Sequence, residues 1–162
     1  MKLQELITQN DLDMNINHIK AFFLGVMSAQ KPMPFKNAVE EMLTEAPEAA
    51  KALNDELKNL WDDLQKNKPA ELQKLFPENS NTVEFLSNAK EQLDFFLTAL
   101  ALSGTHAETI ENEDLADLVD ELEDTVMDLD EYLTEETNEA ESAEFKELLL
   151  ETWQDYLRTA KQ

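Results

Sequence analysis

The sequence predicts an all-α fold, and three observations support this class. Leu, Ala, Glu, Lys, Asp and Gln dominate the 162 residues, and most of these residue types favour helices. Two Gly and five Pro leave little material for hairpin turns. Apolar residues recur at spacings of three and four along most of the chain, as in amphipathic helices. We therefore expect one compact, bundle-like domain of six to seven helices over residues 1–162.

The first two helices are expected before residue 32. A helix over residues 1–8 ends in the polar stretch 9–11, and Asp13 is the expected N-cap of the next helix. The apolar stripe of that second helix consists of Ile16, Ile19, Phe22, Phe23, Val26 and Met27.

Prolines then divide the chain twice. Proline disfavours helix at the residue before it, so Pro32 and Pro34 end the second helix. Pro34 is the expected first position of a third helix that runs to residue 44. Pro47 starts a longer helix that reaches about residue 66. The apolar face of this longer helix is formed by Leu53, Leu57, Leu60, Trp61 and Leu64.

The middle of the chain holds the helix that we expect to be central. A short helical piece over residues 69–76 ends at a proline, and a polar loop leads to a cap at Ser80 or Thr82. The helix over residues 82–103 is the most apolar, which predicts that it is buried, and Gly104 follows it as a left-handed C-cap residue. Its apolar residues are Phe85, Leu86, Leu93, Phe95, Phe96, Leu97, Leu100 and Leu102.

The last third predicts two more amphipathic helices. Thr105 and Glu108 resemble a capping box, and a helix over residues 112–133 follows. The polar segment 134–139 separates it from a last helix over residues 140–160. The apolar residues of the first are Leu115, Leu118, Val119, Leu122, Val126, Leu129 and Leu133. Those of the second are Phe145, Leu148, Leu149, Trp153, Tyr156 and Leu157.

Two apolar segments align with each other. Residues 21–27 and 94–100 match with an offset of 73 positions, and each contains two aromatic residues followed by Leu and a small residue. This match predicts two related core helices that pack closely where Gly25 and Ala99 lie. Chance similarity between two apolar helices is the alternative.

Charge is distributed unevenly. The net charge of −23 repels phosphate backbones and anionic lipid headgroups, which disfavours direct binding to nucleic acid or to a membrane surface. Residues 1–107 hold 16 acidic and 10 basic residues, whereas residues 108–162 hold 20 and 3. The chain is therefore divided into a core part, 1–107, and a strongly acidic helical part, 108–162.

Several functional classes are excluded by composition. Without Cys the chain has no disulfide, thiolate zinc site, iron–sulfur cluster or cysteine nucleophile. Gly-rich phosphate loops and a Gly-x-Ser-x-Gly turn are missing, and the two histidines, His18 and His106, are expected as surface or capping residues. We predict no catalytic, cofactor-binding or metal-ligating residue, and hence no enzyme. No apolar run approaches the roughly 18 residues of a membrane span, and no apolar leader is seen, so we expect a cytoplasmic protein.

The acidic helix supplies the candidate partner-binding residues. Apolar residues recur every three or four positions and carboxylates lie between them, a pattern that is typical of a continuous helix with one solvent-exposed face. An EF-hand loop instead needs a central Gly and oxygens at alternate positions. The candidates are Asp117, Asp120, Glu121, Asp124, Asp128 and Glu131. Met33 and Phe35, in the proline break, are further candidates for a contact surface, the alternative being a hydrophobic staple.

The paired aromatic segments also carry a family resemblance. Lys20-Ala21-Phe22-Phe23, the turn with Pro32 and Pro34, and Phe95-Phe96-Leu97-Thr98-Ala99 resemble the YgfB/YecA-like family of small all-helical bacterial proteins. The resemblance spans about residues 14–160. It implies a non-enzymatic helical protein that self-associates, and no functional residue transfers from it. Long members carry a Cys-rich zinc-binding tail, which this sequence lacks.

These observations favour a cytosolic protein-interaction or regulatory protein that binds a basic partner through its acidic helix. A homodimer is also expected. One alternative is a DNA mimic that occupies the groove of a nucleic-acid-binding protein. Another is a metal-dependent carboxylate-cluster protein. In a further alternative, the acidic surface only keeps an all-helical dimer in solution.

Overall fold

The computed structural model describes residues 2–160, which form eight α-helices and no strand. The all-α prediction is confirmed, and the count exceeds the expected six to seven because two short helices, α1 and α5, are both formed. The expected start of the first helix at residue 1 lies outside the described residues. Across residues 2–160, no helix combines the length and apolar character that crossing a membrane requires. The helices are α1 (Lys2–Gln9), α2 (Ile16–Ser28), α3 (Phe35–Met42), α4 (Pro47–Lys66), α5 (Lys68–Gln73), α6 (Thr82–Leu102), α7 (Glu113–Leu133) and α8 (Glu139–Ala160).

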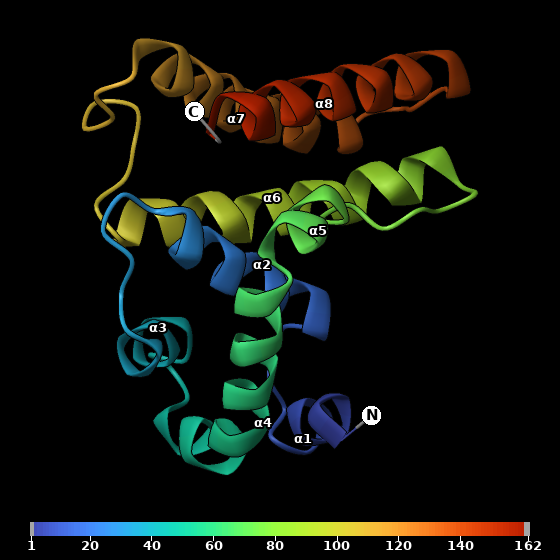
Figure 1. Cartoon of the computed structure of the whole chain (residues 1–162). Coiled ribbons are helices and arrows are strands. Elements are labelled where there is room, and N and C mark those ends of the chain that lie inside the picture. Colours follow the sequence, from blue (N-terminus) through green and yellow to red (C-terminus); the bar gives the residue numbers. More distant parts are fainter. Residues whose placement is uncertain (1, 161–162) are drawn as a thin grey trace.

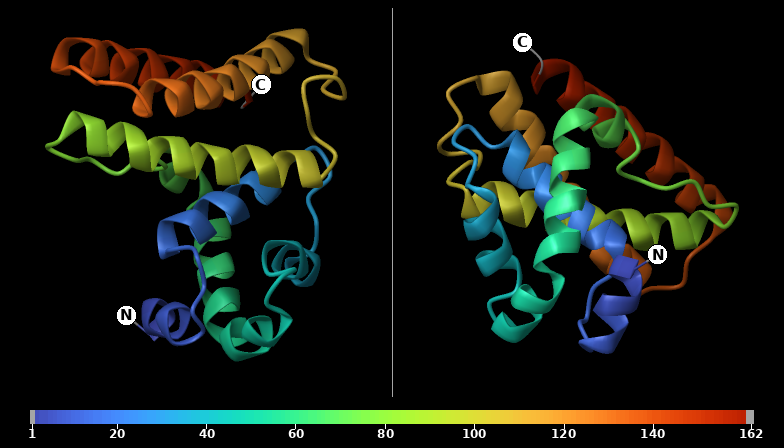
Figure 2. Two further views of the ribbon diagram at one scale, coloured as in Figure 1. Left: turned by 180° about the vertical axis from the view of Figure 1, so that it is seen from behind. Right: turned by 60° about the horizontal axis from the view of Figure 1, so that its bottom comes forward.

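The helices are arranged in layers around α6 (Figure 1). The α7–α8 pair covers one side of α6, and α2 crosses its other side. Beyond α2 lies α4, which contacts α1, α2 and α3. The view from behind shows the same order of layers (Figure 2). The acidic part of the chain thus forms an outer layer of its own.

After its first turn, the helix α2 is almost entirely buried. Each residue from Ile19 to Met27 is buried except Lys20. We predicted that α6 is buried because it is the most apolar helix. It is buried only in part, because one side of α6 is open to solvent and its last residue, Leu102, is 48% exposed. Its central position is confirmed, since α6 contacts α2, α7 and α8.

The close approach of the two aromatic helices is confirmed at Gly25. A Cβ atom added to Gly25 would overlap the carbonyl oxygen of Phe96 and lie 2.7 Å from the Cβ of Ala99. Only glycine therefore fits at this position of α2. The offset of 73 residues that relates the two sequence segments thus relates two helices in direct contact.

Aromatic side chains join the layers. The Phe96 ring lies edge-on to Trp153 at 5.1 Å and to Tyr156 at 5.9 Å, and the Trp153 Nε1–H donates to the Leu72 carbonyl at 2.9 Å. Both rings from α8 are buried. Trp153 and Tyr156 therefore belong to the core, as their helical spacing predicted. The bond to Leu72 gives the buried indole N–H of Trp153 the hydrogen-bond partner that burial requires.

Asparagine side chains cap α2 and α6, and both caps differ from the sequence prediction. The N-cap of α2 is Asn15 rather than Asp13, and that of α6 is Asn81 rather than Ser80 or Thr82. In each case the asparagine Oδ1 accepts a backbone N–H three residues further on, at 2.9 and 3.1 Å. Because Ser, Asp, Thr and Asn are all good caps, residue type alone did not decide between neighbours.

The connection between α6 and α7 also differs from the prediction. Thr105 forms no capping box with Glu108. Its hydroxyl accepts the Gln30 N–H at 2.9 Å and so links this loop to the end of α2. The N-cap of α7 is Asn112. The left-handed conformation predicted for Gly104 is confirmed, with φ of 81°.

Two further details correct the sequence expectations. Pro34 is the N-cap of α3 rather than its first helical residue. Leu148, expected on the apolar side of the last helix, is 55% exposed. The reason is that α8 packs mainly against α5, α6 and α7, and Leu148 lies largely outside these contacts.

Candidate functional site

One side of α7 carries a continuous row of carboxylates, which we call the α7 acidic face. Spacings of three and four residues place its members together, and all of them are exposed. On the opposite side, Val119, Leu122 and Leu129 are buried beneath the helix. The face consists of Asp117, Asp120, Glu121, Asp124, Asp128 and Glu131.

Three of the described cations near this layer are engaged elsewhere. Lys90 of α6 pairs with Asp130 at 2.8 Å, Arg158 pairs with Asp155, and the Lys146 ammonium lies 4.5 Å from the centre of the Phe85 ring. Among the described residues, no member of the α7 acidic face has a cationic partner. Within the described part of the chain, the carboxylates of the face are therefore exposed and make no ion pair.

Glu123 is a partly buried carboxylate of α7 whose pKa is raised. Burial raises the pKa of Glu123, and repulsion by Asp120 and Asp124 raises it further, whereas the nearby His106 lowers it. The direction of the pKa shift shows that negative charge is unfavourable at this point of α7.

The first half of the acidic face also borders a groove between α7 and α8. Asp114, Asp117 and Glu121 line it from α7, and Asp155 and Arg158 line it from α8, around a volume of about 410 Å³. Four of these five side chains are carboxylates. The groove extends the negative surface from α7 onto α8.

Met33 and Phe35 lie on a different part of the molecule. Both are half-buried and pack against the core. The Phe35 ring lies edge-on to Phe23 at 6.1 Å and to Trp61 at 5.6 Å. Helix α3 lies far from the acidic layer (Figure 1). The structure thus brings the six carboxylates together but does not join Met33 and Phe35 to them.

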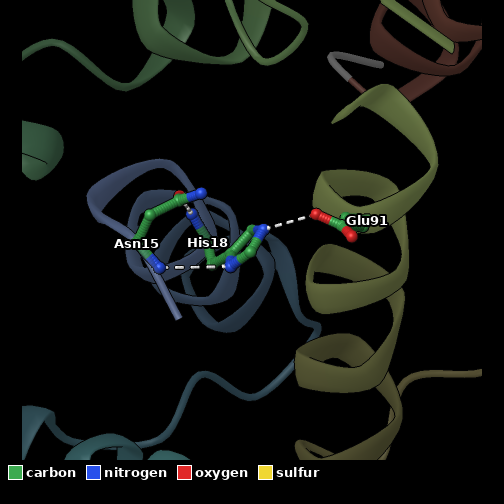
Figure 3. A network of polar contacts seen from close by, with 3 residues as sticks. All are labelled: Asn15, His18 and Glu91. Atoms are coloured by element: carbon green, nitrogen blue, oxygen red, sulfur yellow. Dashed lines mark hydrogen bonds and ion pairs between the residues drawn. The ribbon is translucent and has the colours of Figure 1, made fainter. Parts of the chain in front are cut away.

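A polar network that the sequence did not predict joins α2 to α6 (Figure 3). The Asn15 N–H donates to the His18 Nδ1 at 3.2 Å, and the His18 Nε2 lies 3.0 Å from the Glu91 Oε2. Since Nδ1 accepts, the ring proton is on Nε2 and is donated to Glu91. The imidazole also stacks on Phe95 at 4.6 Å. The expected capping role of His18 is confirmed, and its partner Glu91 is the residue at the same offset of 73.

Within residues 2–160, no three His, Asp or Glu side chains converge in the way that metal ligands do. Comparison of the chain with protein-family models, with curated proteins and with solved structures gives no match. The candidate function therefore rests on the geometry and charge of the chain itself.

Proposed function

We propose that this chain is a non-enzymatic interaction or regulatory protein whose α7 acidic face binds a basic protein partner. The single observation that supports the proposal is the row of six exposed carboxylates without a cation among the described residues. The residues beneath the row, not the row itself, hold α7 to the core. The face is thus free to contact a partner without loss of the fold.

Electrostatic attraction gives this proposal a distinct dependence on salt. A strongly negative surface raises the association rate of a basic protein. The attraction is screened over about 8 Å at physiological ionic strength. Binding through the α7 acidic face is therefore expected to weaken steeply as salt is added.

The test compares two variants with the same net charge. In the first, the six residues of the α7 acidic face are changed to Asn or Gln. In the control, six exposed acids of other elements are changed in the same way: Glu5, Glu40, Glu45, Glu48, Asp55 and Glu78. Basic proteins captured from a host lysate by the wild-type chain are then measured by titration at low and high salt. Loss of binding in the first variant alone supports the proposal, and equal binding by both variants contradicts it.

DNA mimicry is the second candidate, and the spacing of the charges favours it. Residues 117–131 span about 21 Å along the helix axis, so the axial spacing of the six carboxylates is about 4 Å on average. This is close to the axial spacing of roughly 3.4 Å per phosphate of one DNA strand. A mimic competes with duplex DNA for the captured protein. Simultaneous binding of DNA and this chain to that protein would exclude mimicry.

Membership of the YgfB/YecA-like family, a cytoplasmic location and a homodimer stay predictions. The family prediction rests on the two aromatic segments that carry the resemblance. Sedimentation equilibrium tests the dimer directly. A metal-dependent role is tested by calorimetric titration with calcium, magnesium and manganese.

A further inference from the structure

A small apolar groove opens between α3 and the exposed side of α6, and we call it the α3/α6 groove. Its volume is about 230 Å³. Phe22 of α2, Met42 of α3, and Phe95 and Leu102 of α6 supply its apolar surface. It lies apart from the α7 acidic face, with which it shares no residue.

The apolar surface of this groove is partly exposed to solvent. Leu102 is one of three large apolar side chains that are exposed among the described residues. Phe95 is held in place by its stacked contact with His18, at 4.6 Å and an interplanar angle of 9°. Phe22 is the matching aromatic residue of the other aligned segment and is buried beneath the groove. Leu102 and Phe95 thus leave a small apolar surface open to water between α3 and α6.

The size of the groove favours a protein partner over a small molecule. Pockets for small molecules usually exceed about 300 Å³, and this groove falls below that range. A single apolar side chain fits better. Protein interfaces place such anchors in compact pockets that exclude water around them.

The charges at the groove define the partner further. Glu41 of α3 and Asp94 of α6 line it, both are exposed, and neither has an ion-pair partner among the described residues. No Lys or Arg lines the groove. We propose that the α3/α6 groove anchors a basic segment of a partner protein, which inserts one apolar side chain beside Phe95 and Leu102 and places Lys or Arg against Glu41 and Asp94. The choice of a basic partner rests on the proposed function.

A synthetic peptide in which lysines flank a single tryptophan is the probe. We expect saturable binding to the full chain, measured by the fluorescence anisotropy of a dye attached to the peptide. Leu102→Ser is expected to weaken binding at least about fivefold, the effect of losing a hot-spot contact. The paired change Glu41→Gln with Asp94→Asn is expected to weaken it and to reduce its salt dependence.

Leu148→Ser is the matched control, because Leu148 is another exposed leucine, 55% exposed against 48% for Leu102, on a different helix. The control variant is expected to bind the peptide as the wild type does, and circular dichroism checks that both variants are folded. Equal effects of the two leucine changes, undiminished binding of a peptide with alanine in place of tryptophan, or no saturable binding overturns the proposal. A dimer lost only in Leu102→Ser would identify a second copy as the occupant and also overturns it.

The six-site variant of the α7 acidic face separates this proposal from the proposed function. If the groove is the anchor, that variant still binds the peptide and still depends on Leu102. If the variant loses all peptide binding while Leu102→Ser retains it, the groove proposal fails and the acidic face stands. The opposite result supports the groove as the anchor of the peptide, and the α7 acidic face is then judged by the salt titration of the captured protein.

Discussion

At the scale of single residues, Gly25 decides how closely α2 and α6 pack. In an exposed helix, Gly→Ala stabilises by about 1 kcal/mol. Here the added Cβ would meet the Phe96 carbonyl and the Ala99 Cβ, and overpacking of this kind costs about 1–3 kcal/mol. We expect Gly25→Ala to lower the free energy of unfolding, measured by urea denaturation. Ala99→Gly in the same chain is expected to restore part of the loss, and a stabilised Gly25→Ala variant would contradict the packing described above.

His18 combines three contacts in one side chain. It accepts the Asn15 N–H, donates to Glu91 and stacks on Phe95. Because the side chain is 13% exposed, His18→Ala is expected to cost about 1–2 kcal/mol of stability, the range for loss of a helix cap. His106→Ala is the control, with an expected change within about 0.5 kcal/mol. Equal effects of the two changes in urea denaturation would show that the network contributes nothing.

At the scale of helices, the sequence predicted the order and approximate bounds of the elements because prolines and the apolar period of 3.6 are local signals. The contact at Gly25 was predictable for a similar reason, since one glycine stood in an aligned aromatic segment. The pairing of His18 with Glu91 could not be predicted from the sequence, because it depends on how α2 and α6 cross. The exposure of Leu148 depends equally on which sides of α8 other layers cover.

Glu123 of α7 is expected to make the stability of the chain depend on pH. Burial, Asp120 and Asp124 raise the pKa of Glu123 in the folded chain, so the folded state binds this proton more tightly than the unfolded state does. The contribution of Glu123 to stability therefore improves as pH falls from neutral through the range of the raised pKa, and worsens as pH rises. Glu123→Gln is expected to stabilise the chain at about pH 7 by no more than about 0.5 kcal/mol, and to lose this gain in acid.

Thermal unfolding of Glu123→Gln and the wild type at several pH values measures that difference. Glu5→Gln is the control, since Glu5 is exposed on α1, far along the chain from the acidic part. A gain that is the same for both variants, or that grows as pH falls, would show that Glu123 is not destabilised by its surroundings.

At the scale of the whole molecule, the layers separate two kinds of surface. The α7–α8 layer carries most of the excess negative charge, whereas the α3/α6 groove offers a small apolar surface with two carboxylates. The sequence predicted the acidic surface, since its residues lie on one helix. The groove was not predictable from any local sequence pattern, because it is formed by residues of three helices, α2, α3 and α6.

These two surfaces are expected to act on different rate constants of one association reaction. Long-range attraction raises the association rate, whereas desolvated anchoring contacts slow dissociation. With a captured basic partner, the six-site variant of the α7 acidic face is expected to associate about tenfold more slowly at low salt. Leu102→Ser is expected to keep the association rate within about twofold and to dissociate faster. Surface plasmon resonance over a salt series measures the association and dissociation rate constants. If both variants change the same rate constant, the two surfaces do not act on separate steps of binding.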